Sequence, residues 1–196
     1  MPHYLGLDPS LSATGIIVLD ENAKMIHKDV FTTVASGSAV PARMNRFEAL
    51  VVLAKKVCEE FDPEMICIEG YSFMSNMPGS NDRIEYGGIL RYALSRKWPI
   101  MEVSPMSLKK WASGSGKGDK TGVIAGITSL YGMRFQSSDE YDAYALARIA
   151  LQLKNGEIPS NTPQREVIEK LWNPAVKKKK PPRDKPSRKR KPKGIA

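Results

Sequence analysis

The stretch Tyr4-Leu5-Gly6-Leu7-Asp8, near the start of this 196-residue chain, decides the fold. It is a short apolar run that ends in an aspartate. The turn-rich residues 9–15 separate it from a second β-favouring run, Ile16-Ile17-Val18-Leu19. After a turn at 20–22, residues 25–33 have the composition of a third strand. Three strands joined by short connections predict an antiparallel meander.

Beyond the meander, the pattern alternates between helices and strands. Residues 42–61 repeat apolar side chains at three- and four-residue steps, which is typical of an amphipathic helix, and 65–69 form a compact apolar run that predicts a buried strand. Similar patterns predict a strand at 99–103 and helices at 82–97, 105–111, 120–131 and 138–153. Strands separated by helices are parallel. The sequence therefore predicts an α/β fold with a five-stranded mixed sheet, in which a three-strand antiparallel meander joins parallel strands and helices flank both.

Charge is distributed unevenly along the chain. The sequence has 30 Lys and Arg against 21 Asp and Glu, a net charge of +9, but residues 177–196 alone carry +10. We expect a folded domain at 1–155, a linker at 156–176 that can contain a short helix, and a disordered basic tail at 177–196. Such a tail binds polyanions such as DNA by releasing counterions, without reading sequence.

Several protein classes are excluded by what the sequence lacks. No run approaches the roughly 18 apolar residues of a membrane span, and the N-terminus has no signal-peptide pattern, so we expect a cytoplasmic protein without membrane contact. Cys58 and Cys67 cannot build a disulfide framework, and no Cys/His cluster offers a zinc site. The loop 114–120 lacks the phosphate-loop spacing, which would place glycine where Trp111 stands, so no nucleotide cofactor is expected.

Four carboxylates stand where a site can form. Asp8 and Glu69 each end an apolar strand, while Asp139 and Asp142 lie three residues apart at the start of a helix that a Ser137/Glu140 capping box begins. Any one of them alone can be a turn residue or a helix cap. Together, and without His or Cys, they suit Mg²⁺ or Mn²⁺, because these hard ions prefer oxygen ligands. Two such ions activate a water and stabilise the leaving oxygen of a phosphodiester.

Basic and aromatic side chains surround these acids in the sequence. Lys109 and Lys120 flank a glycine-rich turn that can fold both towards the carboxylates, where a lysine binds phosphate or stabilises charge in the transition state. Lys117 is expected to contact phosphate, and Lys109-Lys110 has the alternative of being a solvated helix face. Phe73 lies in an expected loop, where it either stacks on unpaired bases or covers the core.

These motifs, in this order, resemble the RuvC family of Holliday junction resolvases in the RNase H-like nuclease superfamily. The resemblance covers residues 4–150. It rests on Gly6-Leu7-Asp8-Pro9-Ser10 with Thr14-Gly15, on Ile68-Glu69 followed by Phe73, on Ser104-Pro105, Lys109 and the loop 114–120, and on Asp139-x-x-Asp142-Ala143. Gly70-Tyr71 and the basic tail depart from the family pattern. In these departures the chain looks like the divergent members found in bacteriophages.

The resemblance implies an RNase H-like nuclease domain that acts as a homodimer and nicks two symmetric strands of a Holliday junction, leaving 5′-phosphate and 3′-hydroxyl ends. Gly87-Gly88 within the helix 82–97 is the expected dimer surface. The implied site holds two Mg²⁺ per subunit, replaceable by Mn²⁺, on Asp8, Glu69, Asp139 and Asp142. Lys109 and Lys120 complete the catalytic set, and DNA contacts fall to Phe73, Lys110 and Lys117.

Two other functions fit parts of the sequence. An actin-like phosphotransferase also begins its phosphate turn with a Gly-x-Asp strand end, although such enzymes need two domains of this kind and this chain has room for one. A DNA-binding protein with an inactive site would keep the basic tail without needing four acids. An ATPase assay and Mg²⁺-dependent cleavage of a synthetic junction distinguish the three.

Overall fold

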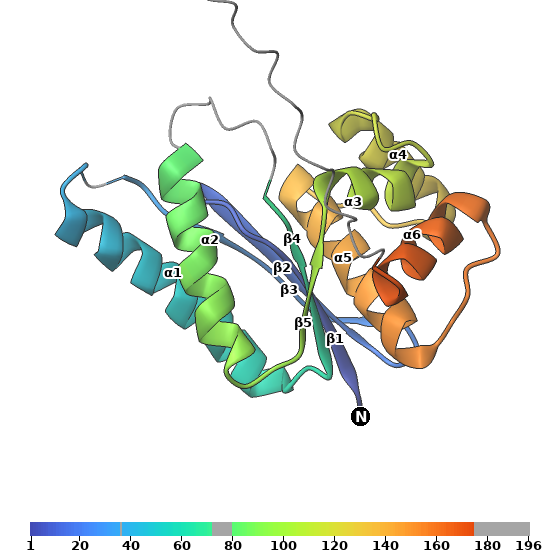
Figure 1. Ribbon diagram of the computed structural model, residues 1–196, viewed down its shortest axis with the longest axis horizontal. Helices are drawn as coiled ribbons and strands as arrows, with labels where there is room; N and C mark the ends of the chain where they lie inside the picture. Colours follow the sequence, from blue (N-terminus) through green and yellow to red (C-terminus); the bar gives the residue numbers. More distant parts are fainter. Residues whose placement is uncertain (36, 72–79, 175–196) are drawn as a thin grey trace, which may run out of the picture.

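The computed structural model describes residues 1–35, 37–71 and 80–174, which form a central sheet with helices on both faces (Figure 1). The strands are β1 (His3–Asp8), β2 (Ala13–Asp20), β3 (Met25–Thr32), β4 (Met65–Glu69) and β5 (Ile100–Val103). The helices are α1 (Val40–Phe61), α2 (Ser80–Ser95), α3 (Pro105–Ser113), α4 (Lys120–Tyr131), α5 (Ser138–Asn155) and α6 (Thr162–Trp172). No helix in these described ranges is long and apolar enough to cross a membrane.

The sheet has the strand order β3-β2-β1-β4-β5, so β1 lies in its centre. β2 pairs antiparallel with both β1 and β3, and β4 pairs in parallel with both β1 and β5. The predicted mixed sheet, an antiparallel meander joined to parallel strands, is therefore confirmed. Because Leu7 pairs with Ile68, the next residues, Asp8 and Glu69, end their strands side by side at one edge of the sheet.

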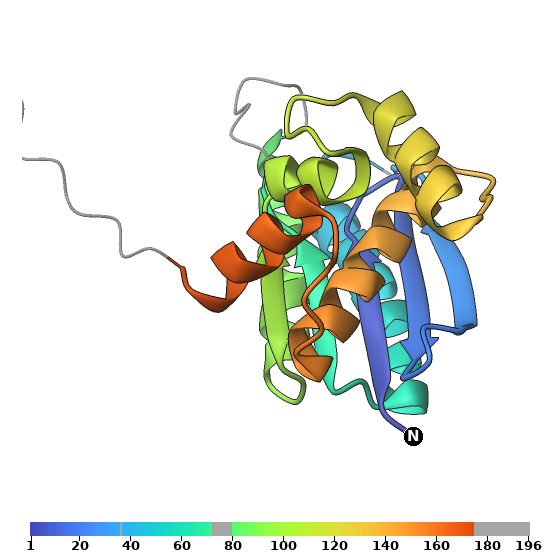
Figure 2. The same cartoon turned by 90° about the vertical axis from the view of Figure 1, so that its right-hand side faces the viewer.

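Successive side chains of β1 alternate between two hydrophobic cores. Leu5 and Leu7 join the core that α1 and α2 cover, whereas Tyr4 joins the core on the opposite face. There α5 runs across the sheet, with α3, α4 and α6 around it (Figure 2). Trp111 of α3 is almost fully buried in this second core, and its indole nitrogen donates a hydrogen bond to Gln152 of α5.

The segment predicted to be a linker that can contain a short helix holds α6. Asn161 caps its start by accepting a hydrogen bond from the Gln164 amide at 2.9 Å. Val167 and Ile168 are buried in the core shared with α3 and α5. Residues 162–172 therefore pack on the domain. The basic tail at 177–196 lies outside the described residues, and its disorder stays a prediction.

Helix α5 lies directly on the sheet backbone at two glycines. A Cβ built on Gly6 would stand 1.9 Å from the carbonyl oxygen of Ala143 and 2.3 Å from the amide nitrogen of Ala147. One built on Gly15 would stand 2.4 Å from the carbonyl oxygen of Asp139. This close approach is possible because α5 carries small residues here and because Gly6 and Gly15 have no side chains. The two glycines therefore set the distance between the helix and the sheet.

We expect Gly6→Ala to lower the free energy of unfolding by about 3 kcal/mol or more, because backbone on both sides of the new methyl group must shift. Gly88→Ala is the matched control. Gly88 is exposed on α2, the nearest neighbouring atom to its Cβ position is the Tyr71 hydroxyl at 3.8 Å, and alanine is the better helix former by about 1 kcal/mol. Urea unfolding of both variants measures the difference. A Gly6→Ala protein as stable as the wild type would contradict this account of the packing.

Candidate active site

The carboxyl ends of β1 and β4 meet the first turn of α5 around a cavity of about 480 Å³. All four carboxylates singled out in the sequence line it: Asp8, Glu69, Asp139 and Asp142. Asp8 is buried, with 7% of its surface exposed. Strand pairing brings Asp8 next to Glu69, and the three-residue helical spacing turns Asp139 and Asp142 towards the same cavity.

Three of these acids, Asp8, Glu69 and Asp142, have raised pKa values. Burial, followed by the charges of Glu69, Asp142 and Asp139, raises the pKa of Asp8 well above its usual value. Burial and the charge of Glu69 raise the pKa of Asp142 to about 7, against the opposing charge of Lys120. Burial also raises the pKa of Glu69, although a hydrogen bond with the Asp8 carboxyl opposes the rise. Asp8, Glu69 and Asp142 are therefore harder to ionise than carboxyl groups in water.

The donor set suits a divalent oxygen-preferring cation. The four carboxylates supply hard oxygen ligands, and a cation among them would relieve the repulsion that raises the pKa values of Asp8 and Asp142. In the described part of the chain, no three Asp, Glu, His or Cys side chains are grouped closely enough to enclose one ion. The carboxylates thus fit a metal by their chemistry, in an open arrangement around the cavity.

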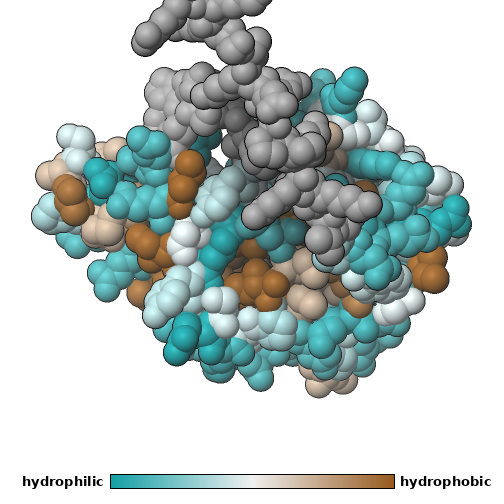
Figure 3. Space-filling view, viewed as in Figure 1, coloured by the Kyte–Doolittle hydropathy of each residue, from teal (hydrophilic) through white to brown (hydrophobic). Residues whose placement is uncertain are grey.

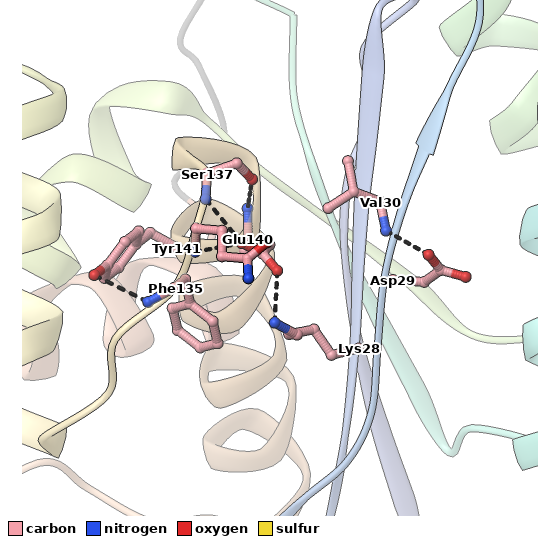
Figure 4. A network of polar contacts seen from close by, with 8 residues as sticks. Lys28, Asp29, Val30, Phe135, Ser137, Glu140 and Tyr141 are labelled. Carbon is pink, nitrogen blue, oxygen red and sulfur yellow. Dashed lines mark hydrogen bonds and ion pairs between the residues drawn. The ribbon is translucent and has the colours of Figure 1, made fainter.

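A polar network holds the start of α5, the helix that carries Asp139 and Asp142 in its first turns. Figure 4 shows this network around Glu140. The Ser137 hydroxyl accepts a hydrogen bond from the Glu140 amide, and the Glu140 carboxylate accepts from the Ser137 amide at 2.8 Å, which confirms the predicted capping box. Lys28 of β3 forms an ion pair with Glu140 at 2.8 Å. Although burial opposes it, these partners hold the pKa of Glu140 below its usual value. The network fixes the first turn of α5 against the sheet.

Two of the predicted lysines reach the cavity. Lys109 of α3 and Lys120 of α4 both line it, and Lys120 Nζ donates a hydrogen bond to the Ser138 hydroxyl at 3.0 Å. Asp119 caps α4 by accepting from the Gly122 amide at 2.9 Å, so the lysine that follows it begins the helix at a defined place. The glycine-rich turn thus folds both lysines towards the carboxylates, as the sequence predicted.

Of the three residues predicted to contact DNA, the structure describes two, and neither is found in the cavity wall. Lys110 forms an ion pair with Glu166 of α6 and does not line the cavity, because successive residues of a helix point about 100° apart and Lys110 faces α6. Lys117 is exposed in the loop before α4 and is also absent from the cavity wall. Phe73 lies outside the described residues, so both of its alternative roles stay predictions.

Sequence reasoning missed two arginines of this cavity. Arg83 and Arg91 of α2 line it together with Tyr71, which follows β4. A Cβ on Gly87 would stand 2.9 Å from the Tyr71 ring, so Gly87 gives room to a side chain of its own chain. The only signal in the sequence was helical spacing, since Gly87 and Arg91 lie one turn apart on the same face of α2.

The raised pKa of Asp142 predicts an unusual pH dependence of stability without metal. Because the pKa of Asp142 is higher in the folded than in the unfolded protein, the folded state binds its proton more tightly, and the free energy of unfolding falls as pH rises from about 4 to about 7. A shift of this size corresponds to at most about 4 kcal/mol. In EDTA, Asp142→Asn should flatten this fall, measured by urea unfolding at each pH. Asp29→Asn, at an exposed position of β3, is the control, and equal slopes in Asp142→Asn and the wild type would refute the shift.

The chain is similar to known proteins over most of its length. Residues 4–150 match the family model of the crossover junction endodeoxyribonuclease RuvC. The chain is 28% identical to the protein of that name from Polynucleobacter asymbioticus, over 74% of this chain and 85% of the relative. It is 31% identical to the one from Saccharopolyspora erythraea, over 73% of each. The fold is similar to that of Thermus thermophilus RuvC in complex with a Holliday junction substrate, at 19% identity and a TM-score of 0.63, over 80% of this chain and 97% of that one. With most of its length matched to the family model, this chain belongs to the crossover junction endodeoxyribonuclease RuvC family.

Proposed function

We propose that this protein is a metal-dependent, structure-selective endonuclease that resolves Holliday junctions and related branched DNA. One observation carries the proposal: four carboxylates and two lysines from separate segments line one cavity, within the part of the chain that matches the family. Curated relatives bear the name of a crossover junction endodeoxyribonuclease, and the T. thermophilus relative has been solved with a Holliday junction. The protein cuts two symmetric strands and leaves 5′-phosphate and 3′-hydroxyl ends.

In this proposal Asp8, Glu69, Asp139 and Asp142 hold two Mg²⁺ ions, for which Mn²⁺ can substitute. When bound, such a pair activates the attacking water and stabilises the leaving oxygen. The carboxylates contribute position: two lie at fixed strand ends and two on a helix whose depth is set by glycine contacts. The raised pKa values of Asp8 and Asp142 support a site that receives positive charge.

The lysines have separate roles. Lys120 begins α4 beside the first turn of α5, which suits it to stabilise negative charge on the phosphate in the transition state. Lys109 binds the scissile phosphate from α3. Lys110 and Lys117, outside the cavity wall, are suited to contacts with DNA away from the reacting centre.

Symmetric cleavage requires two sites, and we place them in a homodimer. Apolar side chains lie exposed on the two helices that cover one face of the sheet (Figure 3). Val52 of α1 is 56% exposed, and Ile84 and Tyr92 of α2 are 50% and 69% exposed. The Tyr71 ring of the same chain occupies the space beside Gly87, so we expect the interface to use exposed side chains of α1 and α2 and not Gly87. Light scattering of the purified protein gives the mass that decides between monomer and dimer.

The carboxylate assignment is tested by neutral variants of similar shape. Asp8→Asn, Glu69→Gln, Asp139→Asn and Asp142→Asn should each cleave a synthetic junction in Mg²⁺ at less than about a tenth of the wild-type rate, because each removes a charged ligand. Binding to the junction in Ca²⁺ should persist. Glu48→Gln, at an exposed position of α1, is the control. Four-way, flap and linear substrates run side by side also test selectivity, and near-normal cleavage by any of these variants would remove that residue from the site.

Lys120→Ala should separate catalysis from binding. If its ammonium acts on the transition state, the single-turnover rate should fall about 100-fold or more. The junction dissociation constant should change far less. Lys154→Ala, an exposed lysine at the other end of α5, controls for loss of one charge. Equal losses in rate and affinity would make Lys120 an ordinary phosphate contact.

A further inference from the structure

Arg91 of α2 has an unusually complete set of partners. Its Nη2 donates a hydrogen bond to the backbone carbonyl of Glu69 at 2.5 Å, and its Nη1 donates to the carbonyl of Gly87 at 3.0 Å. Its Nε donates to a carboxylate oxygen of Glu102 on β5 at 2.9 Å. Three nitrogens of one guanidinium thus hold three separate elements: the end of β4, the middle of α2, and β5.

The face of this guanidinium is also covered. The guanidinium carbon of Arg91 lies 4.3 Å from the centroid of the Tyr71 ring, a distance typical of cation–π contacts. Tyr71 is held in turn by a hydrogen bond from its hydroxyl to the Ile84 carbonyl at 3.1 Å. The absence of a side chain on Gly87 leaves room for both Tyr71 and Arg91.

The hydrogen bonds of Arg91 go to acceptors within the protein, which leaves its guanidinium little capacity to bind a substrate. Arg91 lines the cavity, but its side chain is only 17% exposed, and its planar fork is directed at protein acceptors. Its partner Glu102 packs against Gly70, whose Cβ position would lie 2.9 Å from that carboxylate. The Gly70 amide donates to the Val103 carbonyl at 2.8 Å. The carbonyl of Glu69 and the amide of Gly70, which belong to the same peptide bond, are therefore both held by hydrogen bonds where β4 ends.

We propose that Arg91 is a positioning residue, which aims the Glu69 carboxylate at the metal site by clamping the backbone at the end of β4. The inference rests on the proposed nuclease function, in which Glu69 is a metal ligand. The direction of a side-chain carboxylate depends on how firmly the Cα of its own residue is held. Loss of a residue that holds a metal ligand in place typically lowers metal affinity or activity by about 10- to 100-fold. The planar guanidinium of Arg91 contributes three hydrogen bonds in fixed directions as well as a positive charge.

The test compares Arg91→Lys with the wild type, because lysine keeps the charge and removes the fork. We expect the single-turnover cleavage rate at saturating junction and Mg²⁺ to fall about 10- to 100-fold, and Mn²⁺ binding to the DNA-free protein, followed by electron paramagnetic resonance, to weaken about tenfold. Junction affinity in Ca²⁺ should stay within about twofold, since no phosphate contact is lost. Arg96→Lys, at an exposed residue directly after α2, is the matched control.

Glu102→Gln provides a second variant if Arg91→Lys does not fold. Glu102 is 51% exposed, so the substitution leaves no buried gap, yet it removes the charged partner that orients Arg91. It should weaken Mn²⁺ binding and slow cleavage in the same direction, by a smaller factor.

Three results would overturn the proposal. Wild-type Mn²⁺ binding in Arg91→Lys would show that charge, and not the fork, is sufficient. Weaker junction binding with a normal saturated rate would make Arg91 a phosphate contact. Loss of thermal stability with normal metal binding and rate would make the network purely structural. Failure of the wild type to cleave any junction would instead defeat the proposed function, while Mn²⁺ binding would still test Arg91.

Discussion

The packing of α5 onto the bare backbone of β1 and β2 is the contact on which the rest of the site depends. At Gly6 and Gly15 the carbonyl oxygens of Ala143 and Asp139 lie where a Cβ would otherwise stand. Because a helix rises about 1.5 Å per residue, fixing its depth and register here also fixes the direction of every side chain in its first turns. Asp142 reaches the end of β1 for this reason, and a larger residue at either glycine would move it away.

Two acids near the start of α5 have pKa values shifted in opposite directions. Glu140 pairs with Lys28 and accepts two backbone amides, and these partners lower its pKa. Asp142, two residues later, meets burial and the charge of Glu69, which raise its pKa to about 7. One acid therefore holds the fold together, whereas the other is kept in an environment that opposes its charge. A raised pKa beside a cavity is typical of residues at functional sites, and this contrast supports the proposal that Asp142 belongs to the site.

Different interactions position the carboxylates on the two sides of the cavity. On the α5 side, close helix–sheet contact fixes the carboxylates through the backbone of a capped helix. On the β4 side, Glu69 ends a short strand, and a side chain from another element, Arg91, holds its carbonyl. Position at an active site must hold to within about half an ångström to be productive. A strand end has no capping box of its own, and a cross-linking guanidinium supplies the constraint there.

The sequence by itself determined the mixed sheet, the capping box and which four acids lie around the cavity. These follow from local patterns, such as the apolar run ending at Asp8 and the three-residue spacing of Asp139 and Asp142. It also predicted that Lys109 and Lys120 face the carboxylates, because a glycine-rich turn joins them. Only the tertiary structure decided that Lys110 turns to α6, that Gly87 accommodates Tyr71, and that Arg91 holds Glu69. Contacts of this kind join residues far apart in the chain, and no local period encodes which long side chain will span the gap.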